Sequence, residues 1–486
     1  MPHDSLTHHC QQMSSVLDRL YARSAPWLQS AFLNGHALRV HFHRYGVPFR
    51  RQRQWLLSRE RLSRDEIRNY QDSRIRLIVD WAANNSPYYR ELFRDNGLDA
   101  RDIRGVEDLS QIPILTKEVL RARASDLVTR ERPRRSWLNG HTSGTTGSPL
   151  SVWYDRDTCI LNNAVDWRHK AWAGAQPADW FGMLLGRTIV PPRTPRPPFW
   201  RTNYLQRHIW FSSFHLTEQW LPLYVNEMRK RGLRFLEGYP STLYVLAKHL
   251  VESGKRLPLA AVISSSETLH QAQREIIEGA FECRLFDFYA SAERVVFAAE
   301  CEEHAGKHIA EEFGYAEVVD ESGRHVPDGA LGYLVGTTLH NTAMPLLRYK
   351  IGDASAIRAG QCPCGRTSRL MEDVTTKAED FVVTPDGRVI SPSILTHPFK
   401  PLEQIAKSQI VQDRPGHVLI RLVVTDQFRP EHRATLVAAL KERLGEEMLI
   451  DIELVPDIPR EPSGKYRWVI SRVPFTSDYS WEEPTT

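Results

Sequence analysis

The run HTSGTTGSPLSVWY, residues 141–154, joins small and hydroxyl-bearing residues to an apolar segment with strand character. Glycine lets the backbone approach phosphate oxygens closely, and successive amides with Ser and Thr hydroxyls can donate hydrogen bonds to them. A Walker phosphate loop is excluded, because the GxxxxGK[ST] pattern is absent. Taken alone, the run fits either a polyphosphate-binding loop or an ordinary polar turn.

Composition narrows the class of protein. The chain has 486 residues, of which 41% are hydrophobic and 25% charged, and its formal charge is only +4. These values indicate a globular protein of more than one domain and argue against a nucleic-acid-binding role. No apolar run is long enough to span a bilayer, and the N-terminus lacks the pattern of a signal peptide. Six cysteines do not make a disulfide scaffold, so we expect a reducing, cytoplasmic setting.

The periodicity predicts an α/β architecture. Short apolar stretches alternate with helical ones from residue 136 onward, and a helix over 64–97 is broken at Ser86-Pro87. In the tail, a strand, an amphipathic helix and a second strand are predicted at 417–425, 430–445 and 449–455. We therefore expect three regions: an unassigned helical extension (1–60), a large domain (61–378) and a small C-terminal domain (379–486).

Four further segments carry polar residues that could form a ligand site together with this loop. Tyr289, Ser291 and Glu293 follow a predicted strand at 283–288, and the carboxyl ends of parallel strands are where ligands bind. A second apolar strand is predicted to end on Asp353, a carboxylate suited to binding two sugar hydroxyls. The four segments are FDFYASAER (286–294), MPLLRYKIGD (344–353), TTKAEDFVV (375–383) and IPREPSGKYRWVIS (458–471).

In this order, the motifs resemble the adenylate-forming superfamily. The likeness is greatest to the phenylacetate–coenzyme A ligase branch, which includes relatives from capsule-biosynthesis clusters. It extends from about residue 75 to about residue 473 and leaves residues 1–60 outside. It implies a large N-terminal adenylate-forming domain and a small, mobile α+β lid. Beyond the loop at 141–149, the likeness also rests on NSPYYRELF (85–93), IPILTK (112–117), EGYPSTLYVL (237–246) and CPCGR (362–366).

The resemblance implies a reaction in two halves. A carboxylic acid, expected to be an aryl or other apolar acid, attacks the α-phosphate of ATP and gives an acyl adenylate and pyrophosphate. A thiol, most simply that of coenzyme A, then takes the acyl group and releases AMP. A carrier-protein thiol or an amine in a polysaccharide or secondary-metabolite pathway is an alternative acceptor. A non-catalytic nucleotide-binding partner in such a pathway is a further alternative.

The resemblance also assigns roles to individual residues. Lys465 is the mobile-domain lysine that stabilises charge in the transition state, Glu293 binds Mg²⁺ through a carboxylate oxygen, and Thr146 belongs to the phosphate loop. Asp353 binds the ribose, and Tyr289 lies beside the adenine. The full set of implied nucleotide contacts is Thr142, Ser143, Gly144, Thr145, Thr146, Gly147, Ser266, Glu267, Tyr289, Ala290, Ser291, Asp353 and Lys377.

Four departures from the family pattern bear on function. Ser148 stands where the phosphate loop commonly has lysine, so we expect weaker contact with pyrophosphate. Lys377 replaces an arginine and cannot reproduce a bidentate guanidinium contact. Glu379 and Asp380 stand where paired aspartates mark the hinge. The run VVTPDGRVISPS (382–393) also differs from the ligase pattern near the thiol acceptor, which leaves the identity of that acceptor open.

Cysteine and histidine spacing predicts a structural zinc site. Cys301 and His304 form a C-x-x-H pair, Cys362 and Cys364 add two thiols, and His308 is an alternative ligand. Three thiolates and one imidazole are a tetrahedral set that zinc prefers. Reduced free thiols remain the other interpretation.

Family position places the acid pocket at Tyr239, Pro240 and Ser241. Trp210, Phe211 and Phe214 are further candidates for an aromatic lining, but aromatic residues at these spacings are as often part of the core.

Overall fold

The computed structural model describes residues 20–21, 24–130, 137–143, 149–191, 194–374, 381–390, 392–399, 401–402, 404–458 and 467–473. The chain divides into two compact units. Unit 1 comprises Met1–Gly140 and Val152–Thr375, and unit 2 comprises His141–Ser151 and Thr376–Thr486. The boundary predicted between residues 378 and 379 falls outside the described residues.

Unit 1 is built on a ten-stranded sheet in the order β14-β15-β10-β9-β8-β7-β6-β3-β5-β4. Its middle strands are parallel: β5 (His208–Phe211), β3 (Phe181–Leu184), β6 (Phe235–Gly238), β7 (Ala261–Ser265) and β8 (Leu285–Ala290). The outer strands are antiparallel: β4 (Trp200–Asn203), β9 (Phe297–Glu300), β10 (Lys307–Ile309), β15 (Leu370–Met371) and β14 (Ile357–Arg358). The predicted α/β class is confirmed.

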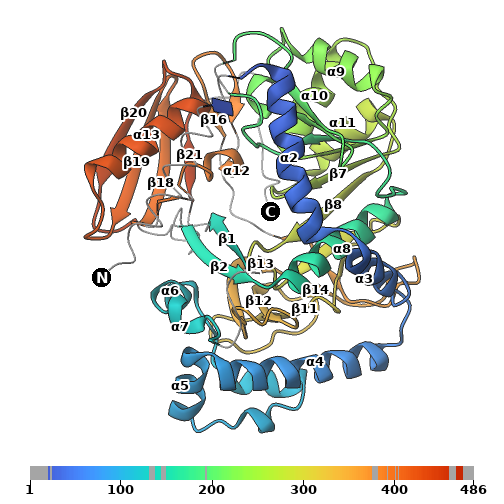
Figure 1. The fold of residues 1–486 in the computed structure, drawn as a ribbon, viewed down its shortest axis with the longest axis vertical. Coiled ribbons are helices and arrows are strands. Elements are labelled where there is room, and N and C mark those ends of the chain that lie inside the picture. The colour runs from blue at the N-terminus through green and yellow to red at the C-terminus, as the bar shows by residue number, and fades with distance from the viewer. Residues whose placement is uncertain are drawn as a thin grey trace. The chain divides into compact units, whose positions relative to one another are not determined.

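Helices pack on both faces of this sheet. On one face lies α8 (Arg156–Trp172), whose Trp167 packs edge-on against Phe181 of β3. Lys170 of the same helix forms a buried ion pair of 2.9 Å with Glu237 of β6. On the other, α9 (Leu221–Lys230) packs Tyr224 against Phe211. The helices α10 (Pro240–Glu252) and α11 (Gln271–Phe281) lie near α9 (Figure 1). The run QAQREIIEGAF (271–281) predicts a helix from the sequence alone, and the bounds of α11 agree with that prediction.

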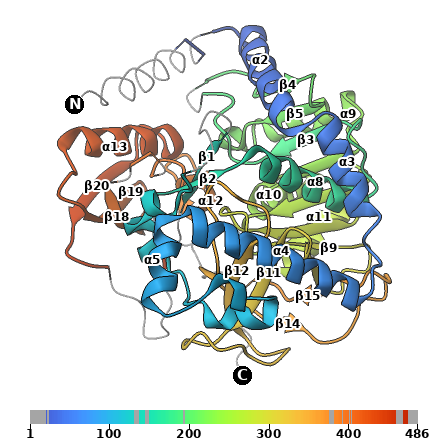
Figure 2. The same cartoon turned by 60° about the horizontal axis from the view of Figure 1, so that its bottom comes forward.

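The N-terminal region of unit 1 is helical. It contains α2 (Pro26–Arg44), α3 (Val47–Leu57), α4 (Arg64–Asn85), α5 (Pro87–Asp95), α6 (Lys117–Ala122) and α7 (Ala124–Leu127). A capping box of Ser63 and Glu66 starts α4, and the predicted break at Ser86-Pro87 separates α4 from α5. Figure 2 shows α2 and α3 beside α8, where the Trp167 indole N–H donates to the Tyr45 hydroxyl at 3.3 Å. The helices α2 and α3, which belong to the extension before residue 60, thus pack on the α8 face of the sheet.

A second, three-stranded antiparallel sheet joins β11 (Gly314–Val319), β12 (Gly332–Thr338) and β13 (Tyr349–Ser355). Arg348 enters β13 in the left-handed region, with φ 46°, and its guanidinium pairs with Glu317 at 3.1 Å. The same guanidinium donates to the carbonyls of Ser110 and Ile112, which fixes the segment SQIPILTK against β13.

Unit 2 has a four-stranded sheet in the order β20-β19-β18-β21. Its strands are β18 (Ile405–Arg414), β19 (His417–Val424), β20 (Leu449–Leu454) and β21 (Val469–Ser471), preceded by the short β16 (Val382–Val383), β17 (Val389–Ile390) and α12 (Pro392–Leu395). The helix α13 (Pro430–Leu444) connects β19 to its parallel neighbour β20 and buries Leu436, Leu440 and Leu444. The predicted strand–helix–strand tail is confirmed. Among the described helices, none is both long and apolar enough to cross a membrane.

The two sheets of unit 1 meet at residues 291–296, where Val295 packs against two glycines. A Cβ on Gly314 of β11 would lie 1.9 Å from the Val295 carbonyl oxygen, and one on Gly336 of β12 would lie 2.5 Å from a Val295 methyl group. Both distances are far inside van der Waals contact. The segment after β8 can therefore dock on the second sheet only because these two positions lack a side chain.

Replacing Gly314 by alanine should strongly destabilise the protein. The added methyl group must displace backbone rather than a flexible side chain, so we expect a loss of about 3 kcal/mol or more in the free energy of unfolding. Gly279→Ala in α11 is the matched control, because no atom lies within 4 Å of its added Cβ and alanine favours helix. Thermal and denaturant unfolding of both variants test this. Equal stability of the two variants would contradict the packing described here.

Candidate functional site

Glu293 lies in the segment that follows β8. It is only 5% exposed, and one carboxylate oxygen accepts a hydrogen bond of 3.0 Å from the hydroxyl of Tyr349 on β13. Burial, followed by the charge of Glu293, raises the pKa of Tyr349 well above its usual value, so the phenol remains a donor. The other carboxylate oxygen, Oε2, has no hydrogen-bond partner within the described residues. A held carboxylate with a remaining oxygen is a suitable ligand for a hard cation.

Tyr289 and Asp353 meet beside Glu293. The Tyr289 hydroxyl donates to Asp353 Oδ2 at 2.7 Å, and burial, then the Asp353 charge, raises the pKa of Tyr289 well above its usual value. Two strand predictions need correction here. β8 continues through Tyr289 and Ala290 instead of ending at 288, because it keeps pairing with β9, and Asp353 lies within β13 instead of ending a strand. The structure thus joins residues from β8 and β13 in one place.

Ser291 stabilises the turn that carries Glu293. Its hydroxyl accepts from the amides of Val295 and Val296 at 3.2 and 3.1 Å. This turn places Arg294 in the left-handed region, with φ 58°, and its guanidinium lies 4.2 Å from the ring centre of Tyr154. Tyr154 in turn donates to the Ala292 carbonyl at 2.6 Å. The end of β2 (Pro149–Tyr154) and the Glu293 turn are therefore anchored to each other.

Glu267 links the predicted adenine wall to the predicted acid pocket. Its carboxylate accepts from the amide and the hydroxyl of Ser241, at 3.0 and 3.1 Å, in the first turn of α10, where an anion is favoured by the helix dipole. The preceding residue, Ser266, has φ 71°, and Pro240 opens α10. Burial raises the pKa of Tyr239, which precedes α10, to about 12.

The aromatic candidates for the pocket lie on different faces of the sheet. Trp210 shares the α8 face with Phe181 and Glu237, whereas Phe211 packs against α9, and Phe214 is buried. The structure adds a residue that sequence reasoning missed: the Arg187 guanidinium carbon lies 4.6 Å from the ring centre of Trp210. No sequence signal marked Arg187, because it stands alone in an irregular segment after β3.

Several predicted residues lie outside the described part of the chain: Gly144, Thr145, Thr146, Gly147, Ser148, Lys377, Glu379, Asp380 and Lys465. The backbone of Thr142 and Ser143 forms the end of β1 (Leu138–Ser143), which pairs with β2 in a two-stranded sheet. The phosphate-loop sequence is thus flanked by two paired strands.

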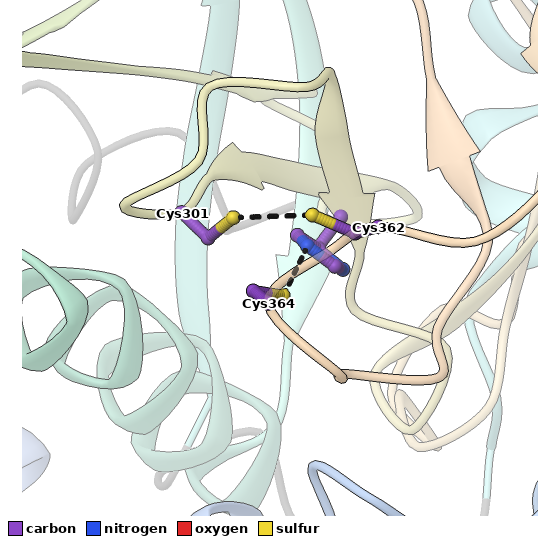
Figure 3. Close-up of side chains that lie close together, drawn as sticks. Cys301, Cys362 and Cys364 are labelled. Atoms are coloured by element: carbon purple, nitrogen blue, oxygen red, sulfur yellow. Dashed lines mark hydrogen bonds between the residues drawn. The ribbon is translucent and has the colours of Figure 1, made fainter.

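A separate cluster of cysteines lies at the antiparallel side of the large sheet. The Sγ atoms of Cys301, Cys362 and Cys364 and a ring nitrogen of His308 all lie within 4.8 Å of one another (Figure 3). The Cys301 and Cys362 sulfurs are 3.5 Å apart, and Cys364 Sγ lies 3.4 Å from His308 Nε2. Sulfurs bound to one tetrahedral zinc at its usual bond length are about 3.8 Å apart, so the donor set fits this metal.

His308, not His304, completes the cluster. His308 lies on β10 opposite Leu370 of β15, next to the turn that carries Cys362 and Cys364. His304 has φ 48°, and its Nδ1 faces Glu300 at 3.1 Å, away from the thiols. The alternative ligand considered from the sequence is therefore the one that the structure brings to the sulfurs, because strand pairing places it there.

The surroundings of the cluster orient its members. Ser368 bonds to His308 Nδ1 at 2.9 Å, which leaves Nε2 facing Cys364, and such a partner commonly orients a histidine that binds metal. Burial, followed by the charge of Arg366, lowers the pKa of His308 to about 4, so the ring is neutral near pH 7. The amides of Glu303 and Arg366 each donate to a cysteine sulfur at 3.4 Å.

Buried charges cross-link β7 to β10 near the site. Asp287 on β8 accepts from Ser264 of β7 at 2.5 Å and pairs with Lys307 of β10 at 3.1 Å, while burial raises its pKa to about 6. Burial alone would raise the pKa of Glu300 on β9. The hydrogen bond with His304 and the charge of Arg274 outweigh the effect of burial, and the pKa of Glu300 falls to about 2. These contacts hold neighbouring strands in register close to Tyr289 on β8.

Comparison with known proteins supports the resemblance inferred from the sequence. A family model described as the CapK C-terminal domain matches residues 382–472. Protein CapK of Staphylococcus aureus is 26% identical, with 84% of this chain and 90% of the relative covered. Phenylacetate-coenzyme A ligase of Thermus thermophilus is 27% identical, with 85% and 98% covered.

Solved structures identify the fold. A 2-hydroxyisobutyryl-CoA ligase, crystallised with 2-HIB-AMP and CoA, superposes with a TM-score of 0.56 at 21% identity, over 85% of this chain and 91% of that one. The same ligase in its postadenylation state gives 0.55. The chain is therefore a homologue of Protein CapK and of phenylacetate-coenzyme A ligases, and it has the fold of the adenylate-forming ligases.

Proposed function

We propose that this protein activates a carboxylic acid with ATP, forming an acyl adenylate and pyrophosphate, and then transfers the acyl group to the thiol of coenzyme A. The observation that carries the proposal is the meeting of Glu293, Tyr349, Tyr289 and Asp353 at the carboxyl end of β8. The phenylacetate-coenzyme A ligase homologues support the same chemistry.

Each side chain in this group has a role that fits adenylation. Bound ATP with Mg²⁺ supplies the α-phosphate that the acid attacks. Glu293, oriented by Tyr349, would hold the cation through its second carboxylate oxygen. Asp353, positioned by Tyr289, would accept hydrogen bonds from the ribose. Lys465 would bring positive charge to the reacting oxygens, and such charge is most effective when it is positioned before the transition state.

A second acceptor is supported by a specific observation. The C-terminal unit matches the CapK C-terminal domain, and the run 382–393 departs from the pattern of phenylacetate ligases near the thiol acceptor. The acyl group could therefore pass to a carrier-protein thiol or to an amine of a biosynthetic intermediate. Both acceptors require the same adenylate, so the first half-reaction is common to them.

Adenylation is tested by acid-dependent pyrophosphate release from ATP with aryl, fatty, hydroxy and amino acids, in the absence of coenzyme A. Lys465→Ala and Glu293→Gln should each slow release by roughly 100-fold or more, because each removes charge stabilisation at the reacting phosphate. Lys407→Ala is the matched control in the same unit as Lys465, since its ammonium only pairs with Asp457 at the surface.

Normal pyrophosphate release by Lys465→Ala would contradict the proposal. Adding coenzyme A then separates the two acceptors. Formation of an acyl thioester with AMP supports a coenzyme A ligase, whereas an adenylate that coenzyme A leaves intact supports a carrier protein or an amine.

We also propose that Cys301, His308, Cys362 and Cys364 bind one structural zinc ion. All four donors come from the protein, which is typical of structural zinc sites. The ion would tie the residue after β9 and a residue of β10 to the turn between β14 and β15, and these are outer strands of the large sheet.

Metal analysis of the native protein should find about one zinc per chain. Cys364→Ser and His308→Ala should lose the metal and unfold at lower temperature, because the ion's binding free energy contributes to folding. His304→Ala and Cys283→Ser are matched controls and should retain it, since neither side chain belongs to the cluster. Zinc well below one per chain in the native protein, or equal loss in His304→Ala, would count against the site.

A further inference from the structure

Arg187 occupies an unusual position after β3. Its side chain retains accessible surface while its guanidinium carbon lies 4.6 Å from the ring centre of Trp210. Burial nevertheless lowers the pKa of Arg187, and the charges that oppose this shift are those of Tyr239 and Glu237. Arg187 is thus exposed on one side and packed against an aromatic ring on the other. Tyr239 belongs to the predicted acid pocket, so Arg187 lies beside it.

Two further arginines approach the same place along α8. Arg294 contacts Cys159 of α8 at 2.8 Å. One turn later on α8, Asn163 donates to the carbonyl of Arg44, the last residue of α2, at 3.3 Å. The positive charges of both Arg294 and Arg187 act on Arg44, whose pKa is lowered first by burial and then by these neighbours. The Arg294 side chain and the Arg44 backbone thus contact α8 one turn apart, and the guanidinium groups of Arg294 and Arg187 are both near enough for their charges to act on Arg44.

Among the described residues, none of the three guanidinium groups lies within ion-pair distance of an acidic side chain. The nearby carboxylate of Glu237 is already paired with Lys170 at 2.9 Å, and that of Glu267 is bonded to Ser241. The buried indole N–H of Trp210, under Arg187, also has no hydrogen-bond partner in the described structure. Like charges that lack a counter-ion repel one another, and a ligand that supplies negative charge relieves this repulsion.

We propose that Arg44, Arg187 and Arg294 recognise a second anionic group on the acid that this protein activates. The proposal rests on the proposed function and specifies its substrate as an acid with a distal carboxylate or phosphate. Guanidinium groups bind either anion through paired N–H donors. The aryl or apolar acid expected from the sequence would then also carry a charged group at its far end.

The proposal also gives the N-terminal extension a role. Arg44 ends α2, which lies outside the part of the sequence that resembles the ligase branch. Tyr45 receives the Trp167 hydrogen bond, and Asn163 holds the Arg44 carbonyl, so the extension is attached to α8 at this point. The extension would then supply one wall of the substrate pocket.

Matched acids test the proposal through acid-dependent pyrophosphate release. The pairs are hexanoate with adipate, and phenylacetate with its para-carboxy and para-phosphonooxy derivatives, which separate a carboxylate from a phosphate. The dianionic member of a pair should be preferred by kcat/KM. Arg187→Met and Arg44→Met should each lower kcat/KM for that acid by about 30-fold or more, with the KM for ATP unchanged, and Arg187→Lys should restore part of the loss.

Arg234→Met is the matched control, because Arg234 also stacks on a ring, that of Phe235, but at the opposite end of the parallel strands. It should leave the preference unchanged. Equal use of both members of every pair, or a raised KM for ATP in Arg187→Met without loss of acid preference, would overturn the proposal. The latter result would assign the arginines to the nucleotide.

A binding measurement separates this inference from the proposed function. Saturating adipate or the phosphonooxy acid should raise the unfolding temperature of the wild-type protein more than hexanoate or phenylacetate does, and Arg187→Met should lose that difference. Absence of turnover with every acid would count against the proposed function alone. Equal stabilisation of the wild-type protein and Arg187→Met by the dianionic acids would count against the anion site alone.

Discussion

The segment 291–296 depends on one steric constraint, the contact of Val295 with two positions that must lack a side chain. Its carbonyl oxygen lies where a Cβ of Gly314 would be, and a methyl group lies where a Cβ of Gly336 would be. A segment held this closely between two sheets cannot shift without moving backbone. The Ser291 hydroxyl closes the turn from within by accepting two amides.

The close packing of Val295 also determines where the two preceding side chains, Glu293 and Arg294, point. Glu293 faces Tyr349 on the second sheet, whereas Arg294, in a left-handed conformation, contacts Tyr154 and Cys159 beside α8. A non-glycine residue at positive φ costs energy that the surrounding contacts must supply, and such residues concentrate at functional sites. The proposed nucleotide chemistry and the proposed acid recognition therefore meet at a single turn.

The cysteine cluster acts on another part of the same sheet. Glu60, just after α3, accepts from the indole of Trp172 at the end of α8 and also pairs with Arg366, which follows Cys364. Arg366 in turn lies 4.6 Å from the ring centre of Trp172. A few partly buried contacts thus connect the N-terminal helices, α8 and the cysteine turn, and the helices α2 and α3 belong to unit 1.

The sequence by itself determined the α/β class, the bounds of α11, the break between α4 and α5, and the strand–helix–strand tail, because local periodicity and prolines decide these features. It also predicted Glu293, Tyr289 and Asp353 as site residues, since their motifs are local, and the structure brings these three side chains to one place. Only the tertiary structure decided that His308 and not His304 joins the thiols, that Phe211 faces away from Trp210, and that the charges of Arg187 and Arg294 act on Arg44. Strand pairing and helix packing bring together residues far apart in the chain, and no local pattern encodes that proximity.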